Sequence, residues 1–338
     1  AFGEQMTGGT HVPLSTAEAN GNIVTIAAGS GTFVNNSAAG YSEIRVNKSS
    51  AVTTAANANK LTIAGGTFKE VVYGGKTSAS SDDATGTAAA TVRSNELWAN
   101  GGTFQKNIRG GDGFASTKAG TATATAAENK LHLTGAAAFP TDNTVYITGG
   151  GASVTSETGK LSLTVEKNSV DGTLTSARAS VSGADGRLNQ RAAAGQAITA
   201  SAVENTVALT GGKADQVYGG QLTLSRATGA ADLHAAKNSV VLTNAASGNN
   251  PAFRGAYIEA HDAKGSLKIT ADGNTVTAEG TALDADDMYG SHVKLQSSNA
   301  STTEAAVTAS RVLMRGKSAA RLAGGYADIV SNGDAALT

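Results

Sequence analysis

Side chains able to carry out chemistry are few in this sequence. The five histidines are His11, His132, His234, His261 and His292. They lack the paired spacing of a metal site, and no serine lies in the sequence context of a catalytic nucleophile. Enzymes that cleave polysaccharides gather acidic residues on one face. The aspartates expected in turns, and therefore scattered, are Asp82, Asp83, Asp185 and Asp262. The sequence predicts no catalytic residue, no metal site and no cofactor.

Two acidic segments are candidate calcium sites. Residues 110–113 place Asp112 among glycines, as in a calcium-binding nonapeptide, but the aspartate is misplaced and no second copy stacks on it. Residues 284–287, with Asp284, Asp286 and Asp287, are the better candidate. Because a calcium site needs six or more oxygen ligands, an exposed acidic loop without a metal is the favoured interpretation.

Asparagine recurs at nearly constant spacing along the chain. The series comprises Asn22, Asn59, Asn95, Asn129, Asn168, Asn205, Asn238 and Asn274, with Ser310 in the ninth place. Such a series indicates nine repeats of about 36 residues. A column of amides could bind a ligand, but stacked asparagines also hydrogen-bond to one another and to the backbone, and asparagine tolerates a left-handed corner. We therefore expect the asparagines to be structural.

Each asparagine opens a run of alternating character. Two residues after the anchor the side chain is always apolar, and one residue after it is polar in every repeat except at Ile23. This period of two is typical of a half-buried strand. It predicts that Val207 points inward, between Val170 and Val240, and that Thr206 points outward.

Three further runs complete each repeat. A second strand is expected to end at a glycine, where glycine permits the positive φ of a corner. The glycines in that place are Gly40, Gly74, Gly110, Gly149, Gly183, Gly219, Gly255, Gly290 and Gly324. A third strand, a polar turn and a fourth strand with small inward residues lead to the next anchor. Insertions at residues 80–87, 136–142 and 187–195 are expected in turns.

The columns stay uniform only if each strand lies over its counterpart in the next repeat, about 4.8 Å away. The sequence therefore predicts an all-β fold, a right-handed parallel β-helix (β-solenoid), because parallel crossovers favour the right hand. A coil this long is expected to be flattened, with strands one and two facing strands three and four. Residues 1–16 are predicted to be a lead-in or the end of a preceding coil. Residues 17–338 are predicted to form one continuous solenoid, truncated within its last coil.

Trp98 is the most conspicuous single side chain. It lies three residues after Asn95, so it is expected to point outward between Thr62 and His132 of the neighbouring coils. An exposed indole beside a hydroxyl group can stack on a sugar ring, although lone surface aromatics are common. Trp98, Thr62 and His132 are therefore the candidate ligand-binding residues.

Composition excludes several classes of function. The net charge is −1, with 16% charged and 4% aromatic residues, which predicts no binding to nucleic acid and no direct insertion into a membrane. The absence of cysteine excludes disulfides and thiolate metal sites. No run of about 18 apolar residues could form a transmembrane helix, and the N-terminus lacks the features of a signal peptide.

The repeat N-x-[VL]-x-[IL]-x-G-G followed by [VI]-[YR]-G-G resembles the passenger regions of Gram-negative (type V) autotransporters. The clearest copies are residues 59–75, 95–111 and 205–220, and the resemblance spans roughly residues 17–338. The fifth repeat departs from it, with Thr173 and Leu174 in place of the first glycine pair. The resemblance implies a right-handed β-helical stalk that is secreted and displayed on the bacterial cell surface, commonly for adhesion. Anchoring is expected through a part of the chain not present here.

These observations leave two main hypotheses for function. The first is a non-catalytic adhesin or structural stalk whose partner is a glycan or protein on a host or neighbouring cell. The second is a self-assembling extracellular fibre segment, whose coil ends stack through unpaired strand edges. A polysaccharide-degrading β-helical enzyme is a weaker third hypothesis.

Overall fold

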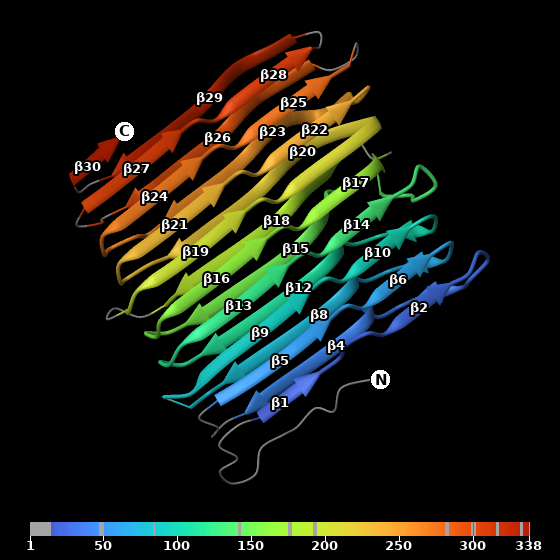
Figure 1. Cartoon of the computed structure of the whole chain (residues 1–338), viewed down its shortest axis with the longest axis horizontal. Coiled ribbons are helices and arrows are strands. Elements are labelled where there is room, and N and C mark those ends of the chain that lie inside the picture. The colour runs from blue at the N-terminus through green and yellow to red at the C-terminus, as the bar shows by residue number, and fades with distance from the viewer. Residues whose placement is uncertain are drawn as a thin grey trace.

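The chain folds as a parallel β-solenoid of about eight turns, which confirms the predicted fold class (Figure 1). The computed structural model describes residues 15–46, 51–83, 85–140, 143–174, 178–191, 195–280, 284–298, 300, 302–315, 318–331 and 334–337. Within these ranges the regular structure is all β, without a helix, and so none of them forms a helix that could cross a membrane. The right-handed sense stays a prediction.

Each turn contributes one strand to each of three parallel arrays. Sheet I holds β2 (Ile23–Ile26), β6 (Lys60–Ile63), β10 (Glu96–Ala99), β14 (Lys130–Leu133), β17 (Ser169–Leu174), the start of β20 (Thr206–Arg226), β22 (Ser239–Thr243), β25 (Thr275–Glu279) and β28 (Arg311–Arg315). Sheet II holds β4 (Ser37–Val46), β8 (Val72–Ser81), β12 (Ile108–Thr117), β15 (Val145–Ser156), β18 (Ala179–Gln190), the rest of β20, β23 (Ala246–His261), β26 (Asp284–Ser298) and β29 (Ser318–Ser331). Because β20 runs through both, sheets I and II are joined.

Sheet III is separate from the other two. It holds β1 (Ser15–Glu18), β5 (Ala51–Asn57), β9 (Thr87–Arg93), β13 (Ala122–Ala127), β16 (Leu161–Glu166), β19 (Ile198–Val203), β21 (Ala231–Ala236), β24 (Leu267–Asp272), β27 (Thr302–Thr308) and β30 (Asp334–Leu337). Three short strands, β3 (Thr32–Phe33), β7 (Thr67–Phe68) and β11 (Thr103–Phe104), form a small sheet between sheets I and II of the first turns.

The long strands of sheet II correct the predicted layering. β8 runs from Val72 through Gly74 and Gly75 to Ser81, so the predicted second and third strands are one strand. Its first half shares one apolar core with sheet I, and its second half shares another with sheet III. Sheet II therefore forms one layer of the flattened coil, and sheets I and III together form the other. The expectation that strands one and two face strands three and four was wrong.

The left-handed corner between sheets III and I lies one residue before the asparagine. Asparagine tolerates this conformation, but the preceding residue adopts it in each turn, as at Ser94 (φ 53°) and Glu204 (φ 57°). This residue turns the chain and leaves the asparagine side chain pointing inward. The corner residues with other side chains are Ala58, Glu128, Lys167, Lys237 and Ala309, and Gly21 and Gly273 complete the series.

The glycine pair of sheet II allows close packing rather than a corner. A methyl group on Gly75 would lie 2.5 Å from the Asn95 Oδ1, and one on Gly110 would lie 2.4 Å from the Gly149 carbonyl oxygen. Neither glycine has a positive φ, which overturns the prediction that this column turns the chain. In the first repeat the predicted register is also off by one, because Gly40 pairs with Gly75.

The predicted turn insertions are only partly turns. Residues 187–190 belong to β18, so the insertion at 187–195 begins later than expected. The insertion at 136–142 does lie between β14 and β15. Residues 84, 141–142 and 192–194 of these insertions, and residues 1–14 of the predicted lead-in, lie outside the described part of the chain, whereas Ser15 and Thr16 belong to β1.

Candidate functional site

The asparagine column is a continuous hydrogen-bonded ladder in the middle of the coil. Asn95 donates from Nδ2 to the Oδ1 of Asn129 and to the carbonyl oxygen of Ala56, both at 2.8 Å. Its Oδ1 accepts the backbone N–H (3.0 Å) and the Nδ2 (2.8 Å) of Asn59. The same pattern continues to Asn274, where Nδ2 instead donates to Ala235 and to the Ser291 hydroxyl. The inner asparagines are fully buried, so their amides have no group left for a ligand.

The structure brings together the three residues of the predicted sugar site. Trp98 on β10 lies in register between Thr62 on β6 and His132 on β14. The His132 ring stacks on the indole at 3.9 Å between centroids and 23° between planes. One face of the indole is therefore covered by a side chain of the protein, which the sequence did not indicate. Sugar binding at this site stays a prediction.

Polar contacts fix the position of these rings. The indole Nε1 donates to Glu96 at 3.3 Å, and this bond is the main cause that lowers the pKa of Glu96. The His132 Nδ1 lies 2.9 Å from the Asp171 Oδ1. Trp98 is thus part of a row of outward side chains that contact one another from turn to turn.

The outer face of sheet II carries a second set of aromatic side chains, which the sequence analysis missed. Six of the seven tyrosines flank the position of the glycine pair, three directly before it and three directly after it, although in three of these turns one of the two glycines is replaced by alanine or serine. They are Tyr73, Tyr218 and Tyr289 on the first side and Tyr41, Tyr257 and Tyr326 on the second. The fixed position of tyrosine relative to the glycine pair was the signal available in the sequence. We call the two rows that flank the pair the tyrosine rows.

The two rows contact each other because the strand breaks its alternation at the glycine pair. Tyr73 and Lys76 are three residues apart on β8, and the Lys76 Nζ lies 5.0 Å from the Tyr73 ring centroid. Tyr289 and His292 are likewise three apart on β26, with ring centroids separated by 5.1 Å. Positions three apart would point to opposite faces of a regular strand.

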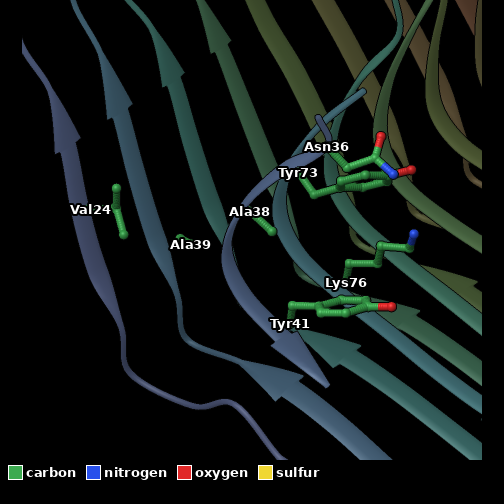
Figure 2. A pocket seen from close by; sticks show the side chains of 7 residues that line it. All are labelled: Val24, Asn36, Ala38, Ala39, Tyr41, Tyr73 and Lys76. Atoms are coloured by element: carbon green, nitrogen blue, oxygen red, sulfur yellow. The ribbon is translucent and has the colours of Figure 1, made fainter. Parts of the chain in front are cut away.

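At the N-terminal end of the tyrosine rows lies a pocket of about 440 Å³ (Figure 2). It is lined by Val24, Asn36, Ala38, Ala39, Tyr41, Tyr73 and Lys76. The Lys76 Nζ lies 5.3 Å from the Tyr41 ring centroid as well, so the ammonium group sits between two tyrosines. The Tyr41 hydroxyl donates to Glu43. Burial raises the pKa of Tyr41 and raises that of Tyr73 to about 12, so both hydroxyls stay protonated.

Ion pairs occupy the middle of the tyrosine rows. Arg109 Nη1 lies 2.5 Å from the Asp112 Oδ1, and Arg187 contacts Asp185 at 2.8 Å. Gly151 lies in register between the two aspartates. Asp185 was predicted in a turn, but it is a buried residue of β18. The negative charge of Asp112 raises the pKa of Arg109 above its ordinary value.

The C-terminal part of the rows holds a partly buried charged network. Arg254 contacts the Tyr218 hydroxyl at 3.0 Å and Asp287 at 3.5 Å, and the Arg321 Nε lies 2.6 Å from Asp287 on the other side. Asp287 therefore belongs to β26 rather than to an exposed acidic loop, which corrects the prediction for residues 284–287. Among the described residues, no three acidic, histidine or cysteine side chains are grouped as metal ligands are.

His292 is enclosed by tyrosines in the same network. Its ring lies 5.1 Å from the rings of Tyr257, Tyr289 and Tyr326, and only 8% of the residue is exposed. Neither ring nitrogen has a hydrogen-bond partner among the residues that the structure describes. Burial, and next the charge of Arg254, lower the pKa of His292 to about 4. The imidazole is therefore neutral at pH 7.

No family model, no curated protein and no solved structure matches this chain. The outward side chains of the solenoid are therefore the basis for inferring its function.

Proposed function

We propose that this chain is a non-catalytic β-solenoid displayed on a cell surface, which binds a glycan or protein of another cell as an adhesin or an adhesive stalk. The main observation in support is the contrast between the inward and outward side chains of each strand. The inward side chains pack in two apolar cores or form the asparagine ladder. Outward groups form ordered rows of aromatic and charged side chains, held in place by the turns on either side. Four of the six tyrosines of the rows are buried against their neighbours, which holds the rows rigid, and Tyr41 and Tyr326 keep accessible surface. Tyrosine and arginine are side chains enriched where proteins bind partners.

The non-catalytic part of the proposal is supported by the pairing of the carboxylates. Polysaccharide cleavage requires two carboxyl groups of which one donates a proton. On the outer face of sheet II, Asp112, Asp185 and Asp287 each contact an arginine. Each of these three carboxylates is therefore engaged by a guanidinium group of the same face rather than directed at a substrate.

Display on a bacterial surface is supported by the resemblance of the repeat to autotransporter passengers. The coil length and the absence of cysteine agree with an extracellular stalk of that kind. In such a stalk, length and outward side chains carry the function.

Binding and turnover measurements on the purified segment test the proposal. We expect binding to whole cells, and to members of a glycan or protein array, without release of reducing sugars or peptides from any polysaccharide or protein. Turnover of any of these substrates contradicts the non-catalytic part. Absence of binding to every cell type and array contradicts the adhesive part.

A further inference from the structure

Lys76 differs from five of the cations on the outer face of sheet II. Arg109, Arg187, Arg254, Lys294 and Arg321 each contact a carboxylate. Lys76 makes no ion pair with any residue that the structure describes, and its ammonium group lies over the rings of two tyrosines. Its neighbour in the row, Asp112, is already bound by Arg109.

The ammonium group of Lys76 is nevertheless held in one place. It lies over the rings of Tyr41 and Tyr73, at 5.3 and 5.0 Å from their centroids. Such cation–π contacts orient a lysine without neutralising its charge. A fixed cation without a counter-ion attracts an anionic group into the adjoining space.

That space is the pocket of Figure 2. Its volume of about 440 Å³ lies within the range of small-ligand sites and fits a ligand of one or two sugar rings. The Asn36 Oδ1 accepts the backbone N–H of Val71 at 3.2 Å, which leaves its Nδ2 as a donor on the pocket wall. Ala38 and Val24 supply apolar wall, and the two tyrosines supply amphipathic wall.

We propose that this pocket binds the carboxylate-bearing sugar unit of an acidic glycan. The sugar carboxylate pairs with Lys76 and accepts a hydrogen bond from Asn36, and the sugar ring packs against Tyr73 and Ala38. A neutral sugar leaves the ammonium group unpaired beside a ligand that has displaced its water, so it binds more weakly. The inference rests on the proposed function and names the ligand class and the place for it.

Two matched pairs of probes test the charge requirement. They are tetragalacturonate with its methyl ester, and sialyllactose with lactose. We expect the segment to bind at least one acidic probe and to bind its neutral partner at least 10-fold more weakly. Raising the salt concentration from 50 to 500 mM should weaken the acidic interaction, because part of it is a screened charge pair. Titration calorimetry measures all of these affinities.

Substitutions then place the interaction at the pocket. Lys76→Gln is expected to weaken acidic binding at least 10-fold with an unchanged melting temperature, and Lys76→Arg to retain most of it. Lys268 is an exposed lysine on the outer face of sheet III, so Lys268→Gln is the control and should bind normally.

The outcomes separate this site from the proposed function. Equal binding by the segment and its Lys76→Gln variant overturns the pocket, as does equal affinity for acidic and neutral probes. If the segment binds cells but neither acidic probe, the pocket is wrong and the adhesive function stands. If it binds neither cells nor probes, both are wrong.

Discussion

The two halves of the coil are built on the same strand repeat but are filled differently. The core between sheets I and II contains phenylalanine, leucine, isoleucine and methionine, with alanine at about a quarter of its positions. More than half of the core between sheets II and III is alanine. Small side chains bury less apolar surface but let two sheets approach closely. The first core therefore gains more from apolar burial, and the alanine-rich core depends more on tight fit.

The largest expected effect is a charge placed in the core between sheets I and II. Val207 is fully buried between Val170 and Val240, so Val207→Asp should cost several kcal/mol of unfolding free energy. Thr206 is adjacent and only half-buried, so Thr206→Asp should cost about 0.5 kcal/mol or less. Thermal melts compare the two variants, and equal losses would show that the assignment of inner and outer faces is wrong.

The ladder that divides the two cores is expected to be nearly as sensitive. Asn205→Ala removes the donor to the Val165 carbonyl and the acceptor for Asn168, which leaves buried polar groups unpaired. The expected cost is about 2–4 kcal/mol. Asn22 is only partly buried, and none of the residues that the structure describes donates to its side chain from a preceding turn, so Asn22→Ala should cost less. Chemical denaturation measures the unfolding free energy of both variants. A larger loss for Asn22→Ala than for Asn205→Ala would contradict the proposed contribution of the ladder to stability.

The tightness of packing in the alanine-rich core can be tested at two glycines that occupy equivalent positions in different turns. A methyl group on Gly186 would lie 2.7 Å from the side chains of Leu163 and Leu222, whereas one on Gly113 would lie no closer than 3.5 Å to Val92. Gly186→Ala should therefore cost about 1–3 kcal/mol through overpacking. Gly113→Ala should be neutral or slightly stabilising, because alanine restricts the unfolded chain. Comparable melting temperatures for the two variants would mean that this core is loosely packed.

Outside both cores, His292 predicts a dependence of stability on pH. Its pKa is lowered to about 4 from an ordinary value of 6.5, so between these values the unfolded chain binds a proton that the folded chain does not. Stability therefore falls as the pH is lowered through this window, by at most about 2 kcal/mol at pH 5. His292→Phe should reduce the loss of melting temperature between pH 7 and pH 5. His234→Phe, on the outer face of sheet III, serves as the control.

Only a small change in stability is expected at Trp98. Trp98→Ala removes the stack with His132 and should cost at most about 1 kcal/mol. If the Trp98 site binds sugar, the same variant loses binding to cells or glycans at an almost unchanged melting temperature. Unchanged adhesion would leave the outer face of sheet II as the adhesive surface.

Much of the fold could be predicted because the inward columns repeat. Val207 and the asparagines were placed correctly, since period two and a fixed spacing determine which strands stack. The continuous strands of sheet II were missed because the alternation slips at Gly74 and Gly75, and a slip in phase resembles the end of a strand. The same slip concealed that Tyr73 and Lys76 lie on one face.

For the candidate sites, the sequence could predict which residues lie next to one another on adjacent turns, but not how their side chains contact. The position of Trp98 between Thr62 and His132 follows from the repeat, but the rotamer that stacks the two rings does not. The ion pair of Asp185 was missed because β18 continues through Asp185, where the sequence composition indicates a turn. The direction of the side chains next to the glycine pair depends on packing between turns, and a local sequence pattern does not contain this information.

The uniform rungs of the asparagine ladder have a consequence for how such a chain can change length. Every inner rung gives the same donors to one side and the same acceptors to the other. Removing the stretch from Asn168 to Glu204, or inserting a second copy of it, would bring together partners that already match. A gene for this protein can therefore gain or lose whole turns by recombination between repeats, while a deletion of half a turn would leave one rung without its complement.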